Sequence, residues 1–175
     1  MKSITFKIAL TAIYTSLATI TFTIESLFPP LILPGARLGL SNVFILLSLI
    51  SLGAQYGYIA LVVKIALGSL FSGNVSSIMY SLPAGIISLS VEYLILKFIP
   101  NISVVSTSVS GAIINTTTQN VVFCLIGKTA EYLCYLPYLS LIAVLSGIVV
   151  GFTVYLIVKK LPSSPPNGGE RINNN

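Results

Sequence analysis

The sequence contains no histidine, no aspartate and no tryptophan, and charged residues of both signs make up only 7% of its 175 positions. Soluble domains carry about 25% charged residues, so this chain lacks the polar surface that a water-soluble fold requires. Hydrophobic residues make up 55% of the chain, and the mean hydropathy is +0.98. The composition therefore predicts an all-α integral membrane protein.

The scarcity of metal-ligating and thiol side chains excludes two further classes of protein. With two cysteines and no histidine, the chain has neither a disulfide framework nor the ligand spacing of a metal site. Cys124 and Cys134 are either a single bridge or two ordinary apolar thiols, and the sequence leaves both interpretations open. We expect no metal and no cofactor.

Apolar runs of roughly the length that crosses a bilayer, about 17 to 25 residues, are separated by short breaks rich in Pro, Gly, Ser and Asn. The first run is too long for a signal peptide and is expected to be a span. The sequence predicts a six-transmembrane-helix bundle in a membrane domain at 1–161, followed by a disordered cytoplasmic tail at 162–175. The predicted spans are 5–28, 38–54, 57–72, 83–99, 104–126 and 135–158.

The distribution of basic residues predicts the orientation of this bundle, because cytoplasmic loops carry an excess of Lys and Arg. If both termini are cytoplasmic, the outer side receives only Arg37 and Lys128. The nine basic residues are dispersed, which argues against nucleic acid as a partner. We expect a multi-pass protein of the cell membrane. The basic residues then on the inner side are Lys2, Lys7, Lys97, Lys159, Lys160 and Arg171.

Two ionisable side chains fall inside predicted spans, where insertion scales put the cost of a charge at about 2.5 to 3.5 kcal/mol. Lys64 lies in the middle of its span, with no acidic residue three or four positions away. Its partner is either a ligand or a buried carboxylate, Glu25 or Glu92, and both hypotheses stay open. For Glu92, the simpler interpretation is local pairing with Lys97 near the cytoplasmic surface.

A stripe of polar side chains follows one side of the fifth predicted span: Asn115, Thr116, Gln119 and Asn120. Amides can join neighbouring helices at about 0.6 kcal/mol each, but this stripe exceeds what such contacts need. It is expected to line a polar cavity. Gly111 and Ala112, one turn earlier, would let another backbone approach closely.

The first span carries small residues at helical spacing: Ala9, Ala12, Ser16 and Thr19. Such a face suits close helix packing. Its partner is either another helix of the same bundle or a separate subunit.

The segment "PGARLGLSN" at 34–42 interrupts two apolar runs. We expect the second helix to begin near 36–38, since a cap at Ser41 or Asn42 would shorten it severely. Gly39 would then permit close packing in its first turn, and Asn42 would face inward. Arg37 beside a helix N-terminus indicates either an anion or headgroup site or interfacial anchoring.

Several stretches resemble a known family: "IESLFPPLILPGARLGLSNVFILLSL" (24–49), "VVKIALGSLFSG" (62–73), "YSLPAGIISL" (80–89) and "VSGAIINTTTQ" (109–119). The chain resembles the Gx transporter family, also named heptaprenyl diphosphate synthase component I, which is similar to the substrate-binding S components of energy-coupling factor (ECF) transporters. Asn115 stands where the family pattern has a histidine and Thr116 where it has an asparagine, while Gln119 is kept. This departure puts any proton or metal role of the histidine in doubt.

The resemblance implies a six-helix S-component-like fold with a substrate pocket that opens outward beneath the first loop. It also implies that the small face of the first helix, at Ala9, Ala12 and Ser16, docks a transmembrane coupling protein driven by ATPase subunits. The implied substrate is a small polar or anionic, vitamin-like molecule. The positions carried over to its site are Glu25, Arg37, Asn42, Lys64, Asn115 and Gln119.

The enzymatic family name can be tested on the residues. Prenyl diphosphate synthesis uses aspartate-rich motifs that hold Mg²⁺, and this chain has no aspartate and four scattered glutamates. It also lacks a GxxxxGK[ST] phosphate loop. We therefore expect no catalysis by this chain alone. Two hypotheses remain, an uptake subunit and a non-catalytic accessory subunit linked to heptaprenyl diphosphate or quinone biosynthesis.

Overall fold

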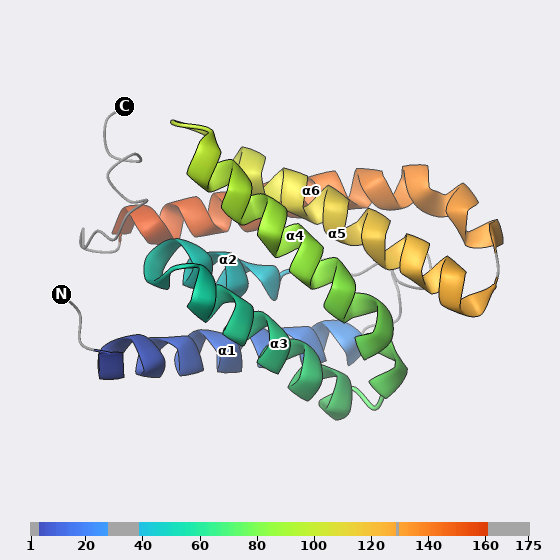
Figure 1. Ribbon diagram of the computed structural model, residues 1–175, viewed down its shortest axis with the longest axis horizontal. Coiled ribbons are helices and arrows are strands. Elements are labelled where there is room, and N and C mark those ends of the chain that lie inside the picture. The colour runs from blue at the N-terminus through green and yellow to red at the C-terminus, as the bar shows by residue number, and fades with distance from the viewer. Residues whose placement is uncertain (1–3, 28–38, 129, 161–175) are drawn as a thin grey trace.

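The computed structural model describes residues 4–27, 39–128 and 130–160, and these segments are helical apart from short connections (Figure 1). The long helices pack side by side, and two short 3₁₀ segments precede α4 and α6. The elements are α1 (Ile4–Leu27), α2 (Asn42–Leu52), α3 (Ala54–Phe71), η1 (Val75–Ser77), α4 (Ile78–Phe98), α5 (Val104–Gly127), η2 (Ala130–Tyr135) and α6 (Leu136–Lys160).

Five of these helices, all except α2, are long and apolar enough to cross a membrane. Their outer faces expose large apolar side chains, such as Ile4 at 73% and Leu145 at 64%, while serines and threonines lie inside, among them Thr107, Ser48 and Ser69. This reversal of the usual soluble pattern is compatible with a multi-pass membrane bundle. Expected spans one, three, four, five and six match the long helices, whereas a sixth full span is not confirmed.

The expected start of the second helix is wrong. α2 begins at Asn42 and has 11 residues, so it is about 16 Å long at 1.5 Å per residue, about half of a 30 Å hydrocarbon core. Gly39 precedes the helix in a left-handed conformation (φ 66°), and Ser41 occupies the cap position without a side-chain capping bond. Figure 1 shows α2 running from the middle of the bundle to the end where α1 begins. The short helix therefore brings its first residue into the interior.

α2 and α3 form a helical hairpin in which a single residue joins the two helices. Gly53 lies between Leu52 and Ala54 with φ 102°, a conformation that L side chains rarely adopt. Gly57 then packs against Leu49 across the hairpin, since a Cβ there would lie 3.4 Å from the Leu49 Cα. This close turn fixes the position of α3, and therefore of its polar residues, relative to α2.

Two glycines of α6 hold it against α5. Gly147 and Gly151 lie four residues apart on α6, and a Cβ on them would lie 2.7 Å from the Val109 Cα and 2.6 Å from the Val105 Cα. The spacing is that of a small-xxx-small packing motif. Only glycine permits this approach of the two backbones, because the opposing atoms are main chain and cannot rotate away.

Four described lysines gather at one end of the bundle. The beginning of α1 and the ends of α4 and α6 lie together there (Figure 1), which places Lys7, Lys97, Lys159 and Lys160 at the same end. Lys128 follows α5 at the opposite end, in a left-handed conformation. This grouping agrees with the predicted one. Lys2, Arg37, Arg171 and the tail at 162–175 lie outside the described residues.

Candidate functional site

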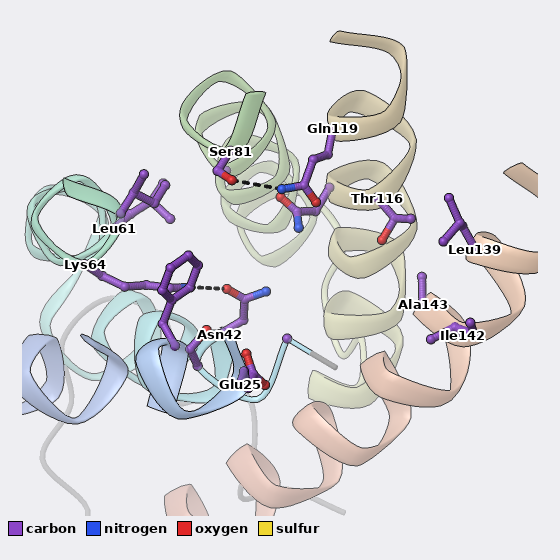
Figure 2. A pocket seen from close by; sticks show the side chains of 16 residues that line it. Glu25, Asn42, Leu61, Lys64, Ser81, Thr116, Gln119, Leu139, Ile142 and Ala143 are labelled. Atoms are coloured by element: carbon purple, nitrogen blue, oxygen red, sulfur yellow. Dashed lines mark hydrogen bonds between the residues drawn. The ribbon is translucent and has the colours of Figure 1, made fainter. Parts of the chain in front are cut away.

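A polar cavity of about 70 Å³ lies between the helices where α2 begins (Figure 2). Its lining comes from α1, the turn before α2, α3, α4, α5 and α6, so segments distant in sequence converge on it. Five predicted site residues, from α1, α2, α3 and α5, line it: Glu25, Asn42, Lys64, Asn115 and Gln119. The structure therefore brings together all the predicted substrate-binding residues that it describes.

Lys64 is the cationic side chain among the described residues that line this cavity. Its side chain is only 4% exposed, and its Nζ donates a hydrogen bond to Asn42 Oδ1 at 2.7 Å. The same Nζ lies 5.6 Å from the centroid of the Phe22 ring, within the range of a cation–π contact. Figure 2 shows Lys64 reaching from α3 toward the start of α2. An amide thus holds the ammonium at the edge of the cavity.

The start of α2 adds to the positive character of this region. The N-terminus of a helix carries a partial positive charge, and here it lies beside the ammonium of Lys64. Glu25 approaches from α1, where its Oε1 accepts a hydrogen bond from the Leu40 amide at 2.5 Å. Glu25 therefore also orders the turn that presents Asn42.

The predicted polar stripe of α5 is confirmed in part. Asn115, Thr116 and Gln119 line the cavity, and Gln119 Nε2 donates to Ser81 Oγ of α4 at 2.9 Å (Figure 2). Asn120 instead accepts a hydrogen bond from Cys124 within its own helix. Ser81 was missed, because one serine at the start of an apolar helix carries no distinguishing signal.

Glu92 does not face the surface as expected, and its predicted pairing with Lys97 is wrong. Its side chain is 9% exposed and lines a second, smaller cavity of about 30 Å³, within electrostatic reach of Lys64. Lys97 is exposed and lies over the rings of Tyr93 and Phe98 at 5.7 and 5.5 Å. Five helical residues turn the chain by about 140° beyond a full circle, so the two side chains leave α4 in different directions.

Gly111 makes room for this buried carboxylate. A methyl group at Gly111 would overlap Oε1 of Glu92 and lie 2.5 Å from its Cδ. Next to this contact, Ser88 Oγ donates to the Gly111 carbonyl at 2.8 Å and ties α4 to α5. The close approach predicted at Gly111 was that of another backbone, whereas the atoms that lie nearest are those of the Glu92 side chain.

The small face of α1 points away from the polar cavity. Ala9, Ala12 and Ser16 are exposed, while Thr19 is buried. Ala12 and Ser16 lie in a mostly apolar groove of about 700 Å³ between α1 and α3, and Ser16 Oγ bonds back to the Ala12 carbonyl at 2.8 Å. The groove thus offers a small-residue surface whose hydroxyls are bonded within α1.

The two cysteines are separate thiols, Cys124 buried and Cys134 exposed. Arg37, the remaining predicted site residue, lies outside the described residues.

Comparison with known proteins identifies the family. The family model described as heptaprenyl diphosphate synthase component I matches residues 14–157, which contain every described helix of the bundle in whole or in large part. No curated protein and no solved structure matches the chain. The chain belongs to the heptaprenyl diphosphate synthase component I family.

Proposed function

We propose that this member of the heptaprenyl diphosphate synthase component I family is the membrane-embedded substrate-binding subunit of an ECF-type uptake system. Its substrate is a small polar or anionic, vitamin-like molecule. The observation that carries the proposal is the internal cavity in which Lys64, Asn42, Asn115 and Gln119 converge. Polar groups inside an apolar bundle are costly and mark ligand or ion sites, and concave sites with a few convergent polar groups bind small molecules.

The short α2 supports this proposal. Transporters place substrate sites at discontinuous helices, whose N-termini point toward anionic groups of the substrate. Here α2 begins inside the bundle, beside the ammonium of Lys64. A carboxylate or phosphate oxygen at this position would meet both a full charge and the positive end of a helix.

The orientation follows from the lysines. Four described lysines share one end of the bundle, where α1 begins and α6 ends, and the positive-inside tendency supports a cytoplasmic location for that end. The opposite end, where α1 finishes near Glu25, then faces outward. In this orientation the cavity receives substrate from outside the cell. The proposed chain crosses the membrane six times, and the short α2 belongs to one of these crossings.

Replacing Lys64 with alanine tests the proposed substrate site. The variant is expected to insert and fold, but to retain about tenfold to a hundredfold less of any co-purifying small molecule, because a charge-assisted hydrogen bond is lost. Mass spectrometry of molecules released from the purified protein measures this. Lys97→Ala, which removes an exposed lysine, is the matched control. A molecule retained equally by Lys64→Ala, or none enriched in the wild-type protein, would contradict the proposal.

An uptake subunit without a nucleotide-binding loop depends on partners for energy. We place the coupling protein, and through it the ATPase subunits, at the groove between α1 and α3. Small residues let two helices approach closely within a bilayer, and Ala12 and Ser16 are exposed there. This assignment gives the chain binding and docking roles and no catalytic one.

The double variant Ala12→Leu, Ser16→Leu tests this docking. It is expected to recover far less coupling protein in a pull-down from native membranes, since the added side chains fill the groove, while its bound small molecule stays. Leu145→Phe, at an exposed position of α6, adds bulk elsewhere on the apolar surface and should change neither result. Recovery of the wild-type chain without any membrane partner under mild detergent would count against the docking.

The family name favours a second candidate, a non-catalytic accessory subunit linked to heptaprenyl diphosphate or quinone biosynthesis. Under this hypothesis the chain anchors a soluble synthase at the lysine-bearing end. A deletion strain distinguishes the two candidates, because loss of an accessory subunit would shorten or deplete the quinone side chain. Unchanged quinones together with impaired solute uptake would support the transport function.

A further inference from the structure

The two internal cavities share part of their lining, and each contains an ionisable side chain that the other lacks. The larger one contains Lys64 and the smaller one contains Glu92, and neither charged residue lines the other cavity. Both cavities share the amide side chains of Asn42 and Asn115, together with Gly39, Leu61 and Gly85. Moving from α3 to α4, a ligand would therefore meet an ammonium, two amides and then a carboxylate.

At the Glu92 end, the neighbouring residues fix the position of the Glu92 carboxylate. The side chain is nine-tenths buried, and its Oε1 lies directly over Gly111, where any Cβ would displace it. Among the residues that the structure describes, none donates a hydrogen bond to this carboxylate. The charge of Lys64 compensates this buried carboxylate only in part, because the cost of burial outweighs it, so a further cationic group that enters beside Glu92 stabilises the ionised form.

The surroundings of Glu92 suit an ammonium group. Such a group has three N–H donors, and the smaller cavity supplies acceptors in addition to the carboxylate: the hydroxyls of Ser88 and Ser108 and the amide oxygen of Asn115. The Ser88 hydroxyl donates to Gly111 O, which leaves its own lone pairs available to accept. The Lys64 Nζ donates to Asn42 and does not line the smaller cavity, although its charge acts on Glu92 from the neighbouring one.

The volumes limit the size of the ligand. One water needs about 10 to 15 Å³ of such space, so cavities of about 70 and 30 Å³ hold on the order of seven water-sized groups in total. A molecule with an amino acid's number of heavy atoms fits without rearrangement. A larger ligand requires the bundle to open.

We propose that the substrate is a small zwitterion, whose anionic group binds at Lys64 and Asn42 and whose ammonium group binds at Glu92. This inference rests on the proposed function and specifies its substrate class. Glu92 is then a specificity-determining residue: the Lys64 end accepts any small anion, and the Glu92 end selects those that also carry a positive charge.

A matched series of probes tests the inference. Linear ω-amino acids of increasing length are compared with the monocarboxylates and the primary amines of the same lengths, as stabilisers of the purified protein. The chain has no tryptophan, so unfolding is followed by a thiol-reactive dye at the buried Cys124 in a Cys134→Ser background. The midpoint temperature is measured against probe concentration.

At least one zwitterion is expected to raise the midpoint in a saturable way, with a concentration for half-effect about tenfold or more below that of its matching acid or amine. Glu92→Gln should remove this advantage and leave the response to the acid unchanged. Lys97→Gln, one to two turns further along α4 at an exposed position, should preserve it. The ranking in the wild-type protein stands as a test even if Glu92→Gln fails to fold.

Each contrary result has a distinct meaning. If acids stabilise the protein as well as zwitterions do, the inference is overturned while the proposed anion site stands. If no probe of any class has an effect, or if Glu92→Gln keeps the zwitterion preference, the inference is also overturned. Whether the proposed function falls with it is decided separately by the molecules that co-purify with the wild-type and Lys64→Ala proteins.

Discussion

Replacing Gly151 with alanine is expected to lower the free energy of unfolding by about 1 to 3 kcal/mol, the usual range for an overpacked interior. The new methyl group would lie 2.6 Å from the Val105 Cα and 3.0 Å from the Ser108 Cβ, so α5 and α6 must separate. The sign is informative, because alanine is otherwise favoured over glycine within a helix by about 1 kcal/mol. Denaturant titration in detergent micelles, followed by far-UV circular dichroism, measures the change. Gly147→Ala should act in the same direction, since its methyl group would meet the Val109 Cα.

Gly57→Ala is the matched control for this experiment. The glycine is also buried within a helix, but a Cβ there would lie at ordinary contact distance, 3.4 Å, from Leu49. Its replacement should be neutral or slightly stabilising. If Gly151→Ala lowers the free energy of unfolding no more than Gly57→Ala does, α5 and α6 do not pack as closely as described. The contact with α6 would then not fix the position of the polar face of α5.

Length and hydropathy predicted most of the bundle, because long apolar helices are specified locally. The spans expected at 5–28 and 104–126 became α1 and α5 with ends shifted by one residue. The packing of those helices was not predicted. "GIVVG" at 147–151 is visible in the sequence, but glycine spacing alone does not identify the helix that packs on it.

The second span shows where hydropathy misleads. Leu38 and Leu40 extend the apolar run to which α2 belongs. An average of hydropathy over a window therefore does not separate the residues before the helix from the helix itself. The start at Asn42 depends on tertiary contacts: Glu25 of α1 bonds the Leu40 amide, and Lys64 of α3 bonds Asn42. Neither contact is encoded in the local pattern. Tertiary structure therefore decides which residue enters the cavity.

The lining of the cavity could be predicted where polar residues stood out in an apolar helix. Lys64 was singled out by its cost inside a bundle, and Asn115 and Gln119 by their place on the polar stripe of the fifth span. All three line the cavity. Glu92 was wrongly predicted to pair with Lys97, because the prediction used their closeness in sequence and not the geometry of the helix. Its five-residue separation from Lys97 places the two on different faces, and this argument needs no structure.

Asn42→Leu is expected to lower the free energy of unfolding by about 1.5 to 3 kcal/mol, the range for a hydrogen bond to a charged group. The change keeps the approximate size of the side chain and removes the oxygen that lies 2.7 Å from Lys64 Nζ. Lys64 is 4% exposed, so its ammonium has little contact with bulk water. In a Lys64→Met background the same change should cost far less, and the difference between the two costs is the coupling energy of the pair. The same denaturant titration provides all four stabilities.

Asn120→Leu is the matched control for this cycle, because it removes an amide that accepts only from the Cys124 thiol within α5. Its cost should be small and equal in the wild-type and Lys64→Met backgrounds. Lys64→Met by itself is expected to be destabilising, since it leaves the Asn42 amide oxygen without its donor and removes the charge that acts on the buried Glu92. If Asn42→Leu costs the same with and without the Lys64 charge, the start of α2 does not hold the ammonium, and the anionic group of a ligand must be bound elsewhere.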